Sequence, residues 1–206
     1  EGITCGIPGT VKRNDQVTVI VDKNGDKTYR EGVSSWEYVD TADGFRFIKE
    51  NGSYRLVEYF GDEDTVTLPG DIHGNPYEIY RMRGVRNVIL PEGMTSIGDY
   101  AFSYCSHLES IVIPDSVTSI GRYAFESCGR LTSIMIGNGV TSIGDSAFWD
   151  CSSLVSFTIP GNVTSIGGCA FMNCHNLAGI TIPSSVASIG ERAFLGTALY
   201  NDPSNW

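Results

Sequence analysis

The sequence predicts a solenoid of stacked coils that follows a small β-rich region. A 23-residue period runs through residues 85–199, where an Ile-Gly pair, a phenylalanine, a cysteine and a leucine recur at fixed offsets. Each repeat also contains an alternating apolar segment, which in all but one of the five regular repeats ends at a proline and is typical of a short half-buried strand. Upstream, residues 17–30 and 45–60 instead show two strand–turn–strand patterns centred on Asn-Gly.

Residues 1–63 are predicted to form a β-rich cap region. The first 16 residues, punctuated by glycine and proline, are expected to be a loose start before the two hairpins. The aromatic residues around the second hairpin either cover the first coil, as solenoid caps do, or form a ligand-binding aromatic face. The segment after Asp22 resembles a calcium loop, but Gly25 stands at its fourth position rather than the sixth, so no calcium site is predicted.

Residues 64–84 are predicted to be a degenerate first repeat, because Val66, Leu68 and Pro69 fall nearly in register with the later strands. Atypical terminal repeats are expected at the ends of such arrays. Three arginines at the end of this segment and just after it form a small basic cluster in the sequence. This cluster is either a solvated surface or a contact for an acidic partner: Arg81, Arg83 and Arg86.

One repeat, residues 108–130, shows how a coil is built. Ile111 and Ile113 alternate with Ser110 and Val112, so the isoleucines are expected to point inward. The segment 121–128 is expected to form one short helical or 3₁₀ turn, because its apolar residues lie three or four apart. Coils stacked about 4.8 Å apart would align equivalent residues into ladders of isoleucine, phenylalanine and cysteine.

The repeated pattern LxxIxIPxxVTSIGxxAFxxCxxL resembles the BspA-like leucine-rich repeat family over residues 64–199. The resemblance implies a right-handed leucine-rich-repeat solenoid with a parallel concave β-sheet and short strands or 3₁₀ turns on the convex side. On this basis residues 64–206 form the solenoid, with regular repeats over 85–199 and a short tail at 200–206. Members of the family are mostly secreted or cell-surface proteins of bacteria, and several resemble adhesins.

Composition excludes some function classes. The net charge of −10 disfavours electrostatic binding to nucleic acid or to an anionic membrane. No stretch reaches the roughly 20 apolar residues that a membrane helix needs, so no membrane insertion is predicted. The resemblance implies an extracellular or cell-surface location, with a signal peptide presumed to have been removed.

The sequence gives no candidate catalytic, cofactor-binding or metal-binding residues. It lacks the nucleophile, zinc-protease and phosphate-loop motifs. Of six cysteines, Cys5 and Cys169 lie off the ladder. The four ladder cysteines are expected to be buried free thiols, since stacked side chains point in parallel and do not converge on a metal. Cys174 and the adjacent His175 are expected to point to opposite sides of the chain. The prediction is therefore a protein that is not an enzyme and needs no cofactor.

The concave face of the predicted sheet is the remaining candidate site. Its outward positions form one row with apolar members and one polar row: Ile89, Val112, Met135, Thr158 and Thr181, and Asn87, Ser110, Ser133, Ser156 and Gly179. A contiguous apolar stripe often marks a contact surface, although β-branched residues suit strands in any case. The leading hypothesis is a surface-associated module that binds a host matrix or cell-surface protein, or less favourably a glycan. The alternative is a structural spacer within a larger surface protein.

Overall fold

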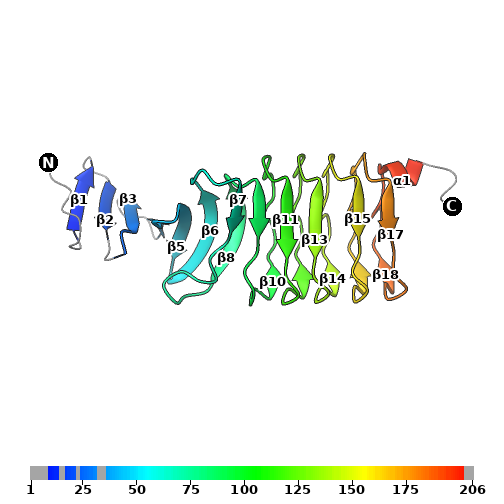
Figure 1. The fold of residues 1–206 in the computed structure, drawn as a ribbon, viewed down its shortest axis with the longest axis horizontal. Coiled ribbons are helices and arrows are strands. Elements are labelled where there is room, and N and C mark those ends of the chain that lie inside the picture. Colours follow the sequence, from blue (N-terminus) through cyan, green and yellow to red (C-terminus); the bar gives the residue numbers. More distant parts are fainter. Residues whose placement is uncertain (1–8, 14–16, 22–23, 32–35, 202–206) are drawn as a thin grey trace. The chain divides into compact units, whose positions relative to one another are not determined.

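The computed structural model describes residues 9–13, 17–21, 24–31 and 36–201. The chain forms two compact units, one made of residues 1–62 and 71–78 and the other of residues 63–70 and 79–206. Figure 1 labels the strands of both units and the single short helix of the described chain. Each unit is built on a different principle of strand pairing, antiparallel in the first and parallel in the second.

The first unit is an antiparallel meander in which each strand pairs with the next. Its strands are β1 (Gly9–Arg13), β2 (Val17–Val21), β3 (Lys27–Glu31), β4 (Trp36–Asp40), β5 (Phe45–Glu50) and β6 (Ser53–Tyr59). Strand β8 (Tyr77–Arg83) begins in this unit and continues into the second. Both predicted hairpins are therefore confirmed. The expectation of a loose start is wrong for Gly9–Arg13, which pairs residue by residue with β2.

The hairpin of β5 and β6 shows how the sequence directs this unit. Asn51 and Gly52 both have positive φ, of 50° and 83°, which is the backbone of the tight turn that Asn-Gly favours between twisted strands. Phe47 and Leu56 are fully buried cross-strand partners. Above them, Arg46 forms a two-bond ion pair with Asp40, at 2.7 and 2.8 Å. Adjacent residues on one strand thus face either an apolar core or a charged surface.

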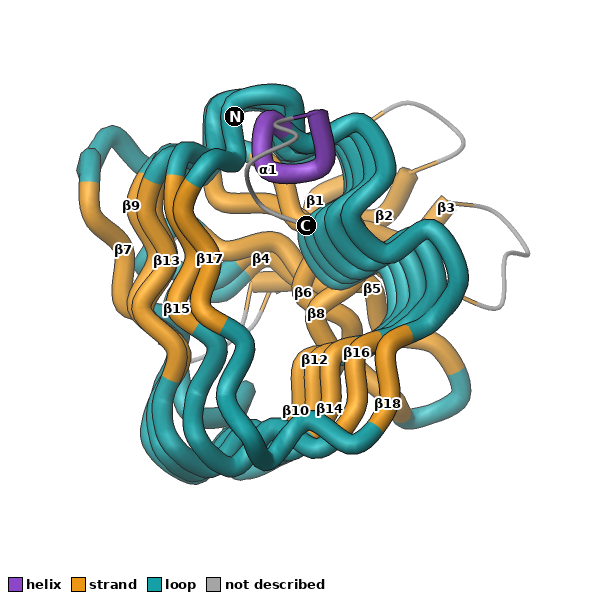
Figure 2. The backbone as a smooth tube through the Cα atoms, turned by 90° about the vertical axis from the view of Figure 1, so that its right-hand side faces the viewer, coloured by secondary structure: helices purple, strands orange, loops and turns teal. Residues whose placement is uncertain are grey.

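The second unit is a solenoid with two columns of parallel strands, which Figure 2 shows end on. The first column contains β7 (Thr65–Thr67), β9 (Asn87–Ile89), β11 (Ser110–Ile113), β13 (Ser133–Ile136), β15 (Ser156–Thr158) and β17 (Gly179–Thr181). The second contains the two-residue Ser-Ile strands β10 (Ser96–Ile97), β12 (Ser119–Ile120), β14 (Ser142–Ile143), β16 (Ser165–Ile166) and β18 (Ser188–Ile189). The solenoid prediction is confirmed, with almost no helix.

Equivalent side chains stack into ladders in the core of this unit. The five repeat phenylalanines lie with ring centroids 5.1–5.5 Å apart and planes within 8° of parallel: Phe102, Phe125, Phe148, Phe171 and Phe194. The repeat leucines are fully buried beside them. Because one coil cannot bury its own apolar edge, each ring depends on the coils on either side of it.

The glycine after each repeat isoleucine is explained by close contact between coils. A Cβ atom at Gly121, Gly144, Gly167 or Gly190 would come within 2.2–2.7 Å of the backbone of the preceding coil. Side chains are therefore excluded at this position wherever another coil precedes it.

The segment between the two columns is not the helical turn that was expected. In the coil of residues 108–130, Tyr123 and Ser127 both have positive φ, of 55°, and two such residues within five cannot belong to a right-handed helix. The segment instead alternates tight turns with bonds to the next coil. Tyr123 and Phe125 donate their N–H groups to Asp145 and Ala147, at 3.0 and 2.7 Å. These bonds satisfy buried backbone groups while keeping the coils in register.

A short helix, α1 (Ala198–Asn201), follows the last turn. Thr197 precedes it, and its Oγ1 accepts a hydrogen bond of 3.0 Å from the N–H of Tyr200, as N-cap residues do. The sequence pattern did not predict this helical turn. In the described part of the chain no helix is long and apolar enough to cross a membrane.

Candidate functional site

The outward surface of the first strand column is here called the strand face, and it contains both predicted rows. Parallel register places Ile89, Val112 and Met135 side by side, and Asn87, Ser110 and Ser133 likewise. Further along, Thr158 pairs with Thr181 and Ser156 with Gly179. Figure 1 shows these strands lying next to one another. The predicted alignment is therefore correct within each set of paired strands.

Exposure along the apolar row is uneven. Met135 exposes 65% of its surface and Ile89 37%, whereas Val112 between them is half-buried. Val155, which directly precedes β15, adds a further apolar side chain that is 57% exposed. Sequence reasoning missed Val155 because it occupies the repeat position of Glu109 and Thr132, where the preceding coils are polar. The most exposed apolar side chains thus belong to the middle coils.

Charge divides the strand face into two parts. Arg86 lies between Asp64 and Glu109, with nitrogen–oxygen distances of 3.5 and 3.8 Å, so the first strands carry a chain of exposed ion pairs. From Thr132 onward the outward positions hold only threonine, serine, valine, methionine, alanine and glycine. The later part of the face is consequently uncharged and partly apolar.

The sheet beneath this face is interrupted between β13 and β15. The first column consists of a four-stranded sheet ending at β13 and a two-stranded sheet of β15 and β17. At the interruption Ile134 and Ile136 are half-buried, whereas Ile111 and Ile113 on β11 are fully buried. We attribute the break to the larger inward side chain of β15.

That side chain is Phe157, which stands where neighbouring coils have isoleucine. Its ring packs edge-on against Phe148 and Phe171, with centroids 5.0 and 4.7 Å apart. An aromatic ring needs more room than isoleucine in a core packed to native density, so the strand that carries it departs from the regular ladder.

The three arginines of the first repeat do not act as one cluster. Arg86 is held by Asp64 and Glu109, as described. Arg81 instead lies over the rings of Tyr80 and Tyr100, at 5.8 Å from each ring centroid. Arg86 therefore lies on the strand face and Arg81 on the turn side, although the two residues are only five positions apart in the sequence.

The ladder cysteines are buried free thiols, as predicted, and Cys169 is half-buried. Cys5 lies outside the described residues. The structure adds that Cys128, Cys151 and Cys174 each donate Sγ–H to the carbonyl of a repeat phenylalanine, at 3.0–3.1 Å. Burial raises the pKa of the Cys105 thiol to about 11 and that of Cys128 well above its ordinary value. Such thiols are poor nucleophiles and poor metal ligands.

The histidines have individual partners rather than a shared site. His175 is exposed while Cys174 is buried, as predicted, and its Nδ1 lies 2.9 Å from the carbonyl of Gly196. In the first unit, His73 Nε2 lies 2.5 Å from the buried carboxylate of Asp26, a contact that no sequence motif indicated. Among the described residues, no group of three or more His, Cys, Asp or Glu side chains could hold a metal ion.

Comparison with known proteins adds a family match. Residues 76–200 match the model of the BspA type leucine rich repeat region, in six copies. A leucine rich repeat protein of T. pallidum is 27% identical, with a TM-score of 0.53, over 80% of this chain and 65% of that one. A leucine rich cell surface protein of Faecalibacterium prausnitzii is 30% identical, with a TM-score of 0.45, over 83% of this chain and 46% of that one. A search of curated proteins found no significant match.

A leucine-rich repeat protein of Bacteroides ovatus is 25% identical with a TM-score of 0.48, and the match covers 65% of this chain and 46% of that one. This chain therefore spans less than two thirds of each of these three proteins. The T. pallidum structure supports the solenoid architecture. The leucine-rich repeat is a non-catalytic fold that commonly serves as a protein-interaction module.

Proposed function

Because the chain belongs to the BspA-type leucine-rich repeat family, we propose that it is a non-enzymatic binding module of a secreted or cell-surface protein. Its partner would be a host matrix or cell-surface protein, bound through the strand face in adhesion. A glycan is the less favoured ligand for this face.

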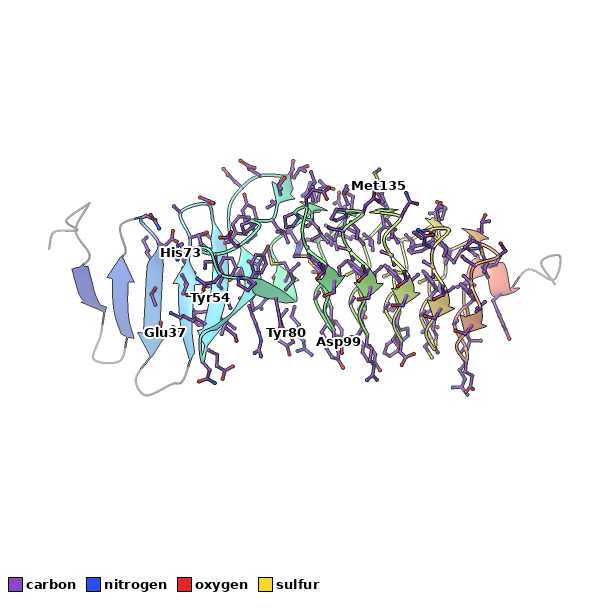
Figure 3. All side chains as sticks on the ribbon, turned by 90° about the horizontal axis from the view of Figure 1, so that it is seen from below. Glu37, Tyr54, His73, Tyr80, Asp99 and Met135 are labelled. Carbon is purple, nitrogen blue, oxygen red and sulfur yellow. The ribbon has the colours of Figure 1, made fainter. Side chains whose placement is uncertain are left out.

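The observation that carries the proposal is the exposed apolar surface over the middle coils. Met135 and Val155 are the most exposed apolar side chains of the first strand column. Met135 lies beside the half-buried Val112, and the outward positions around Met135 and Val155 hold uncharged serine and threonine. Protein interfaces typically combine a weakly charged apolar centre with a polar rim, and the ion pairs of Arg86 would form such a rim. Figure 3 shows Met135 at the outer edge of the solenoid, on the side opposite Asp99.

The test is a binding screen of the purified chain against matrix proteins, mucins and cell-surface glycans. The variant is Val112→Asp with Met135→Asp, which places two carboxylates in the centre of the strand face. Neither side chain is fully buried, so we expect this variant to fold normally and to lose the partner. A partner that binds the wild type and the variant equally well would refute the strand face as the site.

The matched control is Asn138→Asp with Ser184→Asp. Both side chains are exposed and lie just beyond the strands, at the repeat position where an earlier coil carries Asp115. The control therefore adds the same charge of −2 without changing the strand face. We expect it to bind like the wild type, which separates a local effect from general repulsion.

The same screen addresses the alternative function, a structural spacer that holds other domains apart. The phenylalanine ladder and the hydrogen bonds between coils favour a spacer function. They make a regular array that can hold other domains apart without a specific binding site. A spacer would have no saturable partner at micromolar concentration. The surface location has its own test: an antibody raised against the folded chain should bind intact, unpermeabilised cells of the source organism.

A further inference from the structure

A second surface with distinct chemistry lies on the turn side of the first coils. It is here called the tyrosine–arginine patch and consists of Tyr80, Arg81, Tyr100, Tyr104, Arg122 and Tyr123. Tyr100 and Tyr123 stack with centroids 5.1 Å apart and planes 5° from parallel. Figure 3 shows Tyr80 on the side opposite Met135, so the patch and the strand face are separate. Tyrosine and arginine are the residue types most enriched at recognition surfaces.

The two arginines of the patch differ in their ionic partners. Each guanidinium lies over a tyrosine of the stacked pair, Arg81 at 5.8 Å from the centroid of Tyr100 and Arg122 at 5.9 Å from that of Tyr123. Arg122 also approaches the carboxylate of Asp145, at 3.8 Å. Within the described chain, Arg81 has only its ring contacts at short range, and no carboxylate lies within ion-pair distance of it.

Because no carboxylate of the described chain lies within ion-pair distance of Arg81, its guanidinium can bind an anionic group of a ligand. A guanidinium in cation–π contact with rings makes no hydrogen bond to them, so its N–H groups remain able to donate to a ligand. Those groups match the two oxygens of a carboxylate. Charge complementarity therefore points to an anionic group on the ligand.

Tyr104 supplies a fixed apolar surface in the same patch. Its side chain is 60% exposed, and its hydroxyl donates to Glu126 Oε1 at 3.2 Å. Glu126 is itself buried and accepts a second bond of 2.9 Å from Ser103. Arg81 donates its backbone N–H to the carbonyl of Tyr100, at 3.0 Å, so it lies on the coil next to the one that carries Tyr104. The negative charge of Glu126 raises the pKa of the Tyr104 phenol, and the positive charge of Arg81 acts on this pKa in the opposite sense.

An exposed ring held by a hydrogen bond, near a cation with no carboxylate at ion-pair distance, suits a ligand with two features. It needs a face of C–H groups to lie on the ring, and an acidic group to reach the guanidinium. A pyranose that carries a carboxylate has both on one rigid unit. We propose that the tyrosine–arginine patch binds an acidic saccharide, with the sugar ring on Tyr104 and its carboxylate on Arg81.

The repeat itself provides mild test variants. Tyr104 has φ of 60°, and the equivalent positions in later coils hold Ser127, Asp150 and Asn173 with nearly the same φ. Tyr104→Asn is therefore compatible with the coil. Arg81→Gln keeps a long side chain but removes the charge. Arg130→Gln removes the same charge from an exposed arginine outside the patch and is the matched control.

The experiment is a calorimetric titration of the purified chain with 3′-sialyllactose, with lactose as the neutral counterpart. We expect 3′-sialyllactose to bind at least tenfold more tightly than lactose, and more weakly as salt is raised. Arg81→Gln and Tyr104→Asn should each weaken binding about tenfold, while Arg130→Gln should leave it unchanged. Circular dichroism melting of each variant shows whether the fold is intact.

Three outcomes would overturn the proposal: no binding to the wild type, equal binding of lactose, or a folded Arg81→Gln variant that binds normally. A hexaglutamate peptide is the third ligand, and tighter binding of this peptide than of 3′-sialyllactose would assign the patch to acidic protein segments instead. The Val112→Asp, Met135→Asp variant should still bind the saccharide. Failure at one surface is therefore distinguishable from failure at the other.

Discussion

The internal coils and the end coils of the solenoid share one motif but not one environment. Ile166, in an internal coil, exposes 2% of its surface, whereas Ile189, at the same position of the last described coil, exposes 47%. At the other end, a Cβ atom on Gly98 would meet nothing within 4 Å, whereas the same atom on Gly144 would lie 2.7 Å from backbone of the preceding coil. Identical residues thus have different neighbours.

This difference shows where the stability of the array resides. If each repeat were stable by itself, equivalent residues would matter equally wherever they stood. The burial of the isoleucine and the exclusion of a Cβ atom at the glycine both come from adjacent coils. The free energy that stabilises the array therefore comes mainly from the interfaces between coils. Substitutions at matched positions of internal and end coils test this view directly.

The largest difference is expected for the phenylalanine ladder. Phe148 is fully buried between Phe125 and Phe171, so Phe148→Ala should lower the free energy of unfolding by about 3–5 kcal/mol. Phe194 is half-buried and stacks on Phe171 alone among the repeat rings, so Phe194→Ala should cost roughly half as much. Urea unfolding followed by circular dichroism measures both. Equal losses would contradict the interface view.

The isoleucine of the second column gives the next contrast. Ile166→Ala removes a buried side chain and should cost about 2–5 kcal/mol. Ile189→Ala removes one that is nearly half exposed, and should cost about 1 kcal/mol. Both changes delete the same atoms next to the same glycine, so helix or strand propensity cancels in the comparison. A loss at Ile189 as large as that at Ile166 would show that the last coil is covered in solution.

What the sequence could predict follows the same division between repeated and unrepeated features. Strand positions, ladders and the outward rows were predictable because the same residue types recur every 23 positions, and equivalent residues of neighbouring coils stack on one another. The repeat glycine was visible as a pattern, and its cause, the neighbouring backbone, became clear only in three dimensions. Repetition thus reveals which residues stack and leaves open the conformation between them.

The features that sequence reasoning missed depend on single residues. The turn segment looked helical because Ala124, Phe125 and Cys128 have helical spacing, but the positive φ of Tyr123 and Ser127 has no compositional signal such as glycine. The interruption of the strand face depends on one phenylalanine in the place of an isoleucine. The tyrosine–arginine patch likewise comes from tyrosines that later coils do not repeat. A pattern that averages over repeats hides such residues.

Glycine substitutions sharpen the comparison at the first coil. Gly144→Ala would place a Cβ atom 2.7–2.8 Å from the carbonyl carbon and oxygen of Gly121, and the forced separation of two coils should cost about 1–3 kcal/mol. Gly98→Ala has open space, so its effect should stay within about 0.5 kcal/mol. Thermal melting of the two variants distinguishes them. A Gly98→Ala variant as unstable as Gly144→Ala would mean that the glycine serves backbone conformation instead of contact.

The smallest expected effect concerns the cysteine ladder at high pH. Burial raises the pKa of Cys105 from about 9 to about 11, so the unfolded chain loses this proton at lower pH than the folded chain does. Stability from this group is therefore present below pH 9 and declines as pH rises towards 11, by roughly 1 kcal/mol at pH 10. Denaturant unfolding at pH 8 and pH 10 measures the decline. The Cys105→Ala variant lacks this thiol, so its free energy of unfolding should change less between the two pH values than that of the wild type, by about this amount. Because lysine and tyrosine titrate in the same range, the decisive quantity is the difference between this variant and the wild type, and its absence would show that water reaches the ladder in the folded protein.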